Sequence, residues 1–191
     1  MLDKSVRYAG IYFKRAAGTP VLVRPLPDGF RFALYNVGDE TRWARIETAV
    51  LEFDSEFEAL LFFNKKFIPH ADELRRRCIF IENEAGEKIA TATAWWDDLS
   101  GRRSPWLQWV GVDPRYQGLG LGKSLISRAI ELLTELEGDV CFYLHTQTWS
   151  YKAIGIYKAN GFEPTDEKAL YVDRKDNYKK ALRILARVSK Q

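Results

Sequence analysis

The sequence predicts a single domain of mixed α/β organisation, in which short strands alternate with amphipathic helices. The 191 residues are 46% hydrophobic and 29% charged, which is the balance of an ordinary globular domain. Apolar residues recur at strand spacing or helix spacing in successive segments. No internal repeat, low-complexity stretch or long Gly/Ser/Pro linker divides the chain. Residues 1–191 are therefore expected to form one unit.

The first half of the chain predicts two helices set between strands. Ser55-Glu56-Phe57-Glu58 has the spacing of a capping box, which predicts the start of the second helix. Pro69 is expected to stop that helix. The expected elements are a strand or strap within residues 6–20, a strand at 30–37, a helix from 38 with Trp43, Ile46, Val50 and Phe53 on one face, a helix at 55–67, and a hairpin of strands 78–82 and 88–96.

The second half predicts a buried strand, a glycine-rich loop and a long helix. Residues 106–112 form an almost continuous apolar run, which is typical of a strand buried on both faces. Gly138 is expected to end the long helix. The other expected elements are a loop at 97–105, a strand at 140–146, a short helix capped by Ser150 and ending at Asn160-Gly161, an extended piece from Phe162, a closing strand at 169–172, and a C-terminal helix at 176–190.

The C-terminal helix carries one apolar stripe, made by Tyr178, Leu182, Leu185 and Val188. Such a stripe is expected either to close the core of the domain or to form a contact in a homodimer. The sequence alone does not choose between these two roles.

Charge and cysteine content exclude several classes of protein. With 29 basic and 26 acidic residues the net charge is only +3, and the signs are mixed along the chain, so we expect no nucleic-acid partner. No apolar run approaches the roughly 20 residues of a membrane span, so no membrane partner is expected. The two cysteines need no structural role, so we expect a reducing cytoplasmic location. The two histidines form no cluster, so we expect no metal.

The most informative stretch is the loop Asp113–Ser124, which lies between the buried strand and the long helix. Glycines let the backbone approach a ligand, and the free amides at a helix start suit an anionic phosphate. The dinucleotide-binding pattern Gly-x-Gly-x-x-Gly is absent, and a nucleotide-hydrolysing loop would need glycine where Gln117 stands. The alternative is a turn that only permits close packing of strand and helix.

Gln117-Gly118-Leu119-Gly120-Leu121-Gly122 resembles the acyl-CoA pyrophosphate loop, Gln/Arg-x-x-Gly-x-Gly/Ala, of the GNAT superfamily of N-acetyltransferases. A second block, Ser150 to Phe162, resembles that family's helix Asn-x-x-Ala-x-x-x-Tyr-x-x-x-Gly-Phe, with Ser150 in place of the usual Asn. The resemblance covers about residues 90–164. It implies a mixed, mostly antiparallel central sheet with a splayed strand pair and helices on both faces.

The resemblance also implies a reaction, the transfer of an acetyl group from acetyl-CoA to a primary amine of a small-molecule or peptide acceptor. The amine would attack the thioester directly in a ternary complex. The alternative is a non-catalytic module that binds or senses acyl-CoA. By the resemblance, the pantetheine arm would meet the backbone of Val110, Gly111 and Val112, and the remaining cofactor-binding residues would be Gln117, Gly118, Leu119, Gly120, Leu121, Gly122, Lys123 and Ser150.

Two residues are expected to be catalytic. Tyr157 occupies the tyrosine of the family helix, whose phenol faces the sulfur, so it is expected to donate a proton to the leaving thiolate. His145 lies at the end of the preceding strand, and histidine can accept the proton of the amine at neutral pH. Each has a structural alternative: a tyrosine packed beneath its helix, or a histidine bonded to backbone groups.

Aromatic residues make up 14% of the chain, and four of the six tryptophans fall between Trp95 and Trp109. We expect part of this cluster to lie on the acceptor side. Alternation along a strand places Trp106 and Trp109 on opposite faces, and likewise Trp95 and Trp96. We expect Trp96 and Trp109 to line an apolar acceptor site, and Trp95 and Trp106 to be core. The acidic candidates, which could equally face solvent, are Asp97 and Asp98 after the strand and Glu47 and Glu52 near the first helix.

Overall fold

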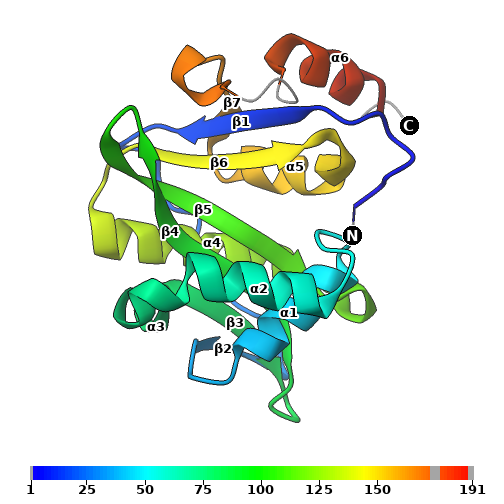
Figure 1. Ribbon diagram of the computed structural model, residues 1–191, viewed down its shortest axis with the longest axis vertical. Helices are drawn as coiled ribbons and strands as arrows, with labels where there is room; N and C mark the ends of the chain where they lie inside the picture. The colour runs from blue at the N-terminus through cyan, green and yellow to red at the C-terminus, as the bar shows by residue number, and fades with distance from the viewer. Residues whose placement is uncertain (1, 173–176, 189–191) are drawn as a thin grey trace.

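A seven-stranded sheet runs through the molecule, and helices cover both of its faces (Figure 1). The computed structural model describes residues 2–172 and 177–188. The predicted α/β class with a mostly antiparallel sheet is confirmed. In spatial order the strands are β2 (Phe30–Leu34), β3 (Cys78–Asn83), β4 (Lys88–Leu99), β5 (Arg102–Val112), β6 (Phe142–Gln147), β1 (Gly10–Arg15) and β7 (Phe162–Pro164).

The two central strands, β5 and β6, form the only parallel pair within the described sheet, and they separate soon after they meet. Their registered pair is Trp106 with Tyr143, although β5 continues to Val112 and β6 to Gln147. Figure 1 shows the two strands diverging beyond this point. The splayed strand pair that the resemblance implies is therefore present.

A bulge distorts β5 on the side of the splay. The β4–β5 register shifts between Thr91 and Thr93, and Trp109 has a positive φ of 52°. Side chains that alternate in a regular strand change faces at such a bulge. Trp109 therefore packs beneath α1 and α2, and Trp106 lies on that same face beside Tyr143. The expectation that these two tryptophans occupy opposite faces is wrong.

Helices from two parts of the chain cover the two faces of the sheet. On one face lie α1 (Glu40–Ala49) and α2 (Glu56–Lys66), whose aromatic residues pack on Trp95. On the other face α4 (Leu121–Glu137) and α5 (Tyr151–Ala159) contribute to the largest core cluster. The capping box is confirmed, because the Ser55 side chain accepts a hydrogen bond from the Glu58 amide at 3.2 Å. Gly138 ends α4 as expected.

Several local expectations are wrong. The expected loop at 97–105 is instead a continuous hairpin, because Ser100 and Gly101 both have positive φ and form a two-residue turn. The expected closing strand at 169–172 is absent, and a short 3-10 helix, Lys168–Leu170, lies there. Ser150 precedes α5, but its side chain makes no capping hydrogen bond. A further short helix, α3 (Ala71–Arg77), has no counterpart among the expectations.

The C-terminal helix α6 (Tyr178–Val188) packs on the rest of the chain. Ala181 and Leu185 are buried in the largest core cluster, so part of the apolar stripe closes the core. Residues 176, 189 and 190, which the sequence also assigned to this helix, lie outside the described residues.

Candidate active site

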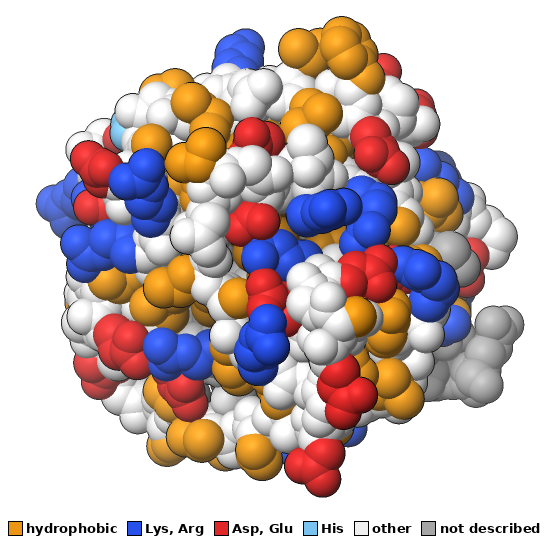
Figure 2. Space-filling view, turned by 90° about the horizontal axis from the view of Figure 1, so that it is seen from below, with side chains coloured by type: hydrophobic (Ala, Val, Ile, Leu, Met, Phe, Trp, Pro, Cys, Tyr) orange, Lys and Arg blue, Asp and Glu red, His pale blue; other side chains and the backbone are white. Residues whose placement is uncertain are grey.

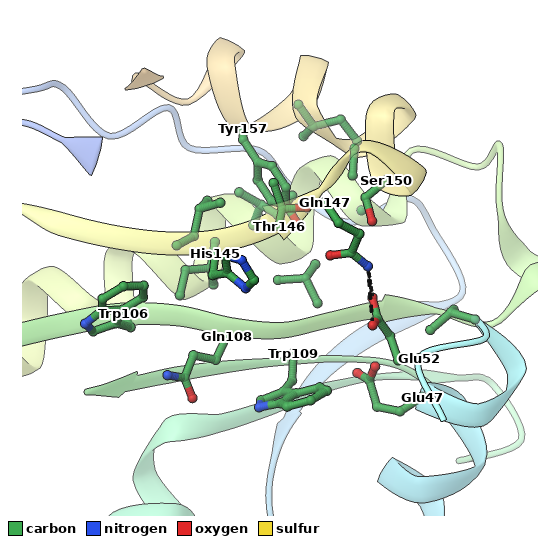
Figure 3. A pocket seen from close by; sticks show the side chains of 18 of the residues that line it. Glu47, Glu52, Trp106, Gln108, Trp109, His145, Thr146, Gln147, Ser150 and Tyr157 are labelled. Carbon is green, nitrogen blue, oxygen red and sulfur yellow. Dashed lines mark hydrogen bonds between the residues drawn. The ribbon is translucent and has the colours of Figure 1, made fainter. Parts of the chain in front are cut away.

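A large cavity of about 970 Å³ lies where β5 and β6 diverge. Residues 106–110 and 112 of β5 and residues 144–147 of β6 line it, so the splay itself forms the opening. One half of the cavity is bounded by the glycine loop, α4 and α5, and the other by residues from α1, α2 and the start of β5. Figure 3 shows labelled side chains from β5, β6, α1 and α5 around this cavity. The cavity therefore connects the two faces of the sheet.

The glycine loop supplies the anion-binding half. Gly118 and Gly120 have φ of 85° and 86°, and a Cβ at either position would meet no atom within 4 Å. Glycine at these two positions permits the positive φ, and the absence of a side chain leaves the loop uncrowded. The Lys123 amide donates a hydrogen bond to the Gly120 carbonyl at 2.9 Å, and it is the first amide of α4 with such a bond inside the helix. The amides just before it lie at the positive end of the helix dipole, where a phosphate fits.

Most of the expected cofactor-binding residues meet at this half of the cavity. The ones that line it are Val110, Val112, Gln117, Gly118, Gly120, Leu121, Gly122, Lys123 and Ser150. Leu119, whose side chain is 51% exposed, does not line it. Gly111 is also absent from the lining, and a Cβ there would lie 3.1 Å from Glu47 Oε1. The glycine at 111 thus leaves room for the Glu47 carboxyl group.

Tyr157 lines the cavity from α5 and is buried. Burial, together with the nearby carboxyl groups of Glu52 and Glu47, raises the pKa of its phenol above the ordinary value. Tyr157 therefore holds a proton on the cavity wall at neutral pH, as a tyrosine with its ordinary pKa also would. Its role as the proton donor stays a prediction.

His145 and Gln147 lie on neighbouring positions of the same face of β6, and both line the cavity. The His145 ring is 4.4 Å from the ring of Tyr12 on the adjacent strand. Gln147 Nε2 donates a hydrogen bond to Glu52 Oε1 at 3.1 Å, drawn as a dashed line in Figure 3. Glu52 follows α1, so this bond ties the two sides of the cavity together.

Two carboxyl groups face the centre of the cavity from the α1 side. Glu47 is 1% exposed, and neither of its carboxylate oxygens has a hydrogen-bond partner among the described residues. Burial, reinforced by the charge of Glu52, raises the pKa of Glu47 well above its ordinary value. Enclosure by the cavity walls likewise raises the pKa of Glu52, although its side chain remains open to solvent. From the sequence, Glu47 and Glu52 were only candidate acceptor-side residues that could equally have faced solvent.

The aromatic residues are arranged differently from the expectation. Trp109 lines the cavity as expected, but so does Trp106, which was expected to be core. Trp96 lies instead on a second pocket of about 250 Å³, where its ring stacks on Trp95 at 4.2 Å between centroids. Asp97 lines both pockets. The bulge in β5 places Trp109 on the same face as Trp106, and no sequence pattern marked it.

Sequence reasoning did not single out four further lining residues, Tyr12, Phe62, Gln108 and Leu170. They come from β1, α2, β5 and the short helix after β7. Because these segments are distant in the sequence, only the folded chain brings them together. Their signal was at most the polar Gln108 inside an apolar strand.

Charge on the remaining surface is mixed. Figure 2 shows one face on which basic and acidic side chains are interspersed. Two arginines of the described chain pair with buried carboxylates, Arg31 with Glu82 and Arg115 with Asp113, each at 2.7 Å. Across residues 2–172 and 177–188, no group of three or more His, Cys, Asp or Glu side chains is placed to hold a metal ion. In the same part of the chain, no helix has the length and apolar character needed to cross a membrane.

Comparison with known proteins gives one consistent match. Residues 40–162 match the model of the Acetyltransferase (GNAT) family. A curated relative, mycothiol acetyltransferase of Rothia mucilaginosa (strain DY-18), is 28% identical over 123 residues, which cover 61% of this chain and 35% of that protein. The chain thus spans about a third of the length of that relative.

Solved structures share the fold. A GCN5-related N-acetyltransferase from Sphaerobacter thermophilus superposes with a TM-score of 0.65 at 18% identity, covering 84% of this chain and 49% of that one. A GNAT-family acetyltransferase from Colwellia psychrerythraea gives a TM-score of 0.61 at 12% identity, covering 83% and 54%. This chain spans about half the length of each.

The buried Glu47 predicts a pH-dependent stability. Its pKa is raised in the folded state, so the folded protein binds the proton more tightly than the unfolded chain does. The contribution of Glu47 to the free energy of unfolding is therefore fully present below the ordinary glutamate pKa of about 4.5. It falls as the pH rises above that value. Glu47→Gln should remove this loss and raise the urea midpoint at pH 7.5 relative to the parent, with little difference at pH 4. Equal gains at both pH values would contradict this assignment.

Proposed function

Because the chain belongs to the acetyltransferase (GNAT) family, we propose that it transfers an acetyl group from acetyl-CoA to a primary amine held in the same cavity. One observation carries the proposal. A glycine loop at the start of α4 opens into a cavity that crosses the sheet and reaches Tyr157, Glu47 and His145. The cavity has room for two substrates that meet at the splay, so direct attack in a ternary complex is the simplest mechanism.

The loop residues fit the charged end of acetyl-CoA. The amides between Gly118 and Lys123 would hold the pyrophosphate, since the loop is uncrowded and precedes the first helical hydrogen bond. Lys123 and Lys152 line the same half and would add positive charge. The diverging backbone of β5, from Val110 to Val112, would meet the pantetheine arm.

Tyr157 would donate a proton to the sulfur as the thioester breaks. The phenol carries its proton at neutral pH in the resting enzyme, and the developing thiolate would draw it off. Acetyl-CoA, when bound, supplies the thioester that the amine attacks.

The amine must be neutral to attack. A lysine-like amine with a pKa of about 10.4 is mostly protonated at pH 7, a cost of roughly 4–5 kcal/mol. His145 would accept this proton, because it lies on β6 in the cavity wall and histidine exchanges protons near neutrality. The carboxyl groups of Glu47 and Glu52 would hold the ammonium beforehand. The free thiols Cys78 and Cys141 fit a reducing, cytoplasmic location, which is part of this proposal.

Gly120→Glu should weaken acetyl-CoA binding by at least about 100-fold, because it places a negative charge at the anion site and a side chain at a φ of 86°. Calorimetry measures this directly. Gly155→Glu is the matched control, since Gly155 is exposed on α5 with no atom within 4 Å of its Cβ position. Unchanged affinity in a folded Gly120→Glu protein would refute the phosphate site.

Tyr157→Phe should lower kcat by about 100-fold between pH 6 and 9, with acetyl-CoA affinity retained, because the proton donor is removed. Tyr151→Phe, in the same helix but outside the cavity lining, is the control. Thiol release from acetyl-CoA over a panel of amines measures the rate. If the parent protein binds acetyl-CoA but releases no thiol with any amine, the chain is a binding module and not an enzyme.

His145→Gln should lower kcat/KM by about 100-fold at pH 7, because the proton acceptor is removed. Acetyl-CoA affinity should not change. If kcat/KM is unchanged in His145→Gln and falls in Glu52→Gln, Glu52 accepts the proton in its place.

A further inference from the structure

The half of the cavity opposite the glycine loop is acidic. Its lining includes Glu47, Glu52, Asp97 and Asp98. Of the described lysines and arginines that line the cavity, only Lys66 belongs to this half, and it is paired with Asp97 at 3.1 Å. An acceptor that carried a carboxylate or phosphate would face repulsion here, whereas a cationic amine would be attracted.

This half also contains hydrogen-bond acceptors without partners. Both Glu47 carboxylate oxygens and Gln108 Oε1 are buried and unpaired among the described residues. Gln108 Nε2 donates to Asp97 Oδ2 at 3.3 Å, and this bond fixes the orientation of the amide. The reverse orientation would place the amide oxygen against the carboxylate. Because an unpaired buried acceptor is costly, the wall favours a ligand that donates hydrogen bonds.

The remaining wall is aromatic and held firmly. Trp109 contacts Trp43, Phe53 and Phe62, with ring centroids 5.4, 5.4 and 4.6 Å away. Its positive φ is sparsely populated for a bulky residue, and this packing holds it in place. Trp106 lines the same half, and its indole N–H is buried with no hydrogen-bond partner in residues 2–172 and 177–188. Flat rings of this kind favour a planar apolar body, and the free N–H can bond a hydroxyl on it.

We infer that the acceptor is an arylalkylamine: a primary amine on a planar apolar body, with no anionic group and with room for a hydroxyl. Glu47 and Gln108 take the N–H donors, and Trp106 and Trp109 flank the ring. The inference rests on the proposed function, since it names the substrate class of that same site. In the reaction, the amine nitrogen forms a bond to the acetyl carbon and the carbon–sulfur bond breaks. His145 takes one proton from the bound ammonium before the attack, and the leaving thiolate takes one from Tyr157. The second proton, which the attacking nitrogen loses as the amide forms, returns to the Tyr157 phenolate.

The test compares three amines with the full chain and acetyl-CoA. Tyramine has the inferred features, tyrosine adds only a carboxylate, and glucosamine replaces the apolar ring with a polar one. We expect kcat/KM for tyramine to exceed that for tyrosine by about 100-fold, because of the acidic wall. It should exceed that for glucosamine by about tenfold or more, because of ring burial.

Variants then assign the effect to the wall. Glu47→Gln should raise the KM for tyramine about tenfold, since the ammonium of the bound amine stabilises the ionised Glu47 carboxyl group, and an amide cannot form that charge-assisted hydrogen bond. Glu84→Gln, an equal charge change in an exposed turn, should leave the KM unchanged. Neither variant should change acetyl-CoA affinity, which also shows that both proteins fold.

The outcomes separate the two proposals. If tyrosine or glucosamine is acetylated as fast as tyramine, or if tyramine alone fails as acceptor, the arylalkylamine inference is wrong and acetyl transfer stands. If acetyl-CoA does not bind and no amine releases thiol, the proposed function itself fails.

Discussion

The separation of β5 from β6 is the constraint on which the rest of the site depends. The strands register at Trp106 and Tyr143 and then diverge, so backbone groups beyond that point are released from the sheet. A continuous sheet would keep the two helical layers apart. The opening instead lets a ligand pass from the glycine loop on one face to α1 and α2 on the other. Both candidate substrates can therefore meet inside the core of the domain.

The bulge in β5 determines what lines this opening. By changing the alternation at Trp109, it places two tryptophans on the acceptor face where a regular strand would place one. Rings from α1, α2 and the segment after α1 then hold Trp109. A backbone conformation that costs free energy is thus maintained by side-chain packing, as is common at functional sites.

The cavity has opposite electrostatic character at its two ends. Helix amides and two lysines lie at one end, and carboxyl groups lie at the other. Glu47 is buried with no hydrogen-bond partner in the described part of the chain, which costs stability, and the missing side chain of Gly111 makes that burial sterically feasible. Such a cost is expected where a ligand completes the hydrogen bonds. Charge separation of this kind would orient the proposed anionic donor and the proposed cationic acceptor toward opposite ends of the cavity.

The sequence by itself determined the family, most of the order of strands and helices, and the loop and tyrosine proposed to act on acetyl-CoA. These depend on glycine spacing, helix periodicity and motif order, which can be recognised from short segments of the sequence. Only the tertiary structure decided the acceptor wall. One bulge placed Trp106 and Trp109 on the same face, while Trp96 lies on the second pocket. Long-range packing set Glu47 against Gly111 and in the same cavity as Gln108 and Tyr157. Contacts between distant segments leave no periodic signal, because their positions follow from how the layers pack.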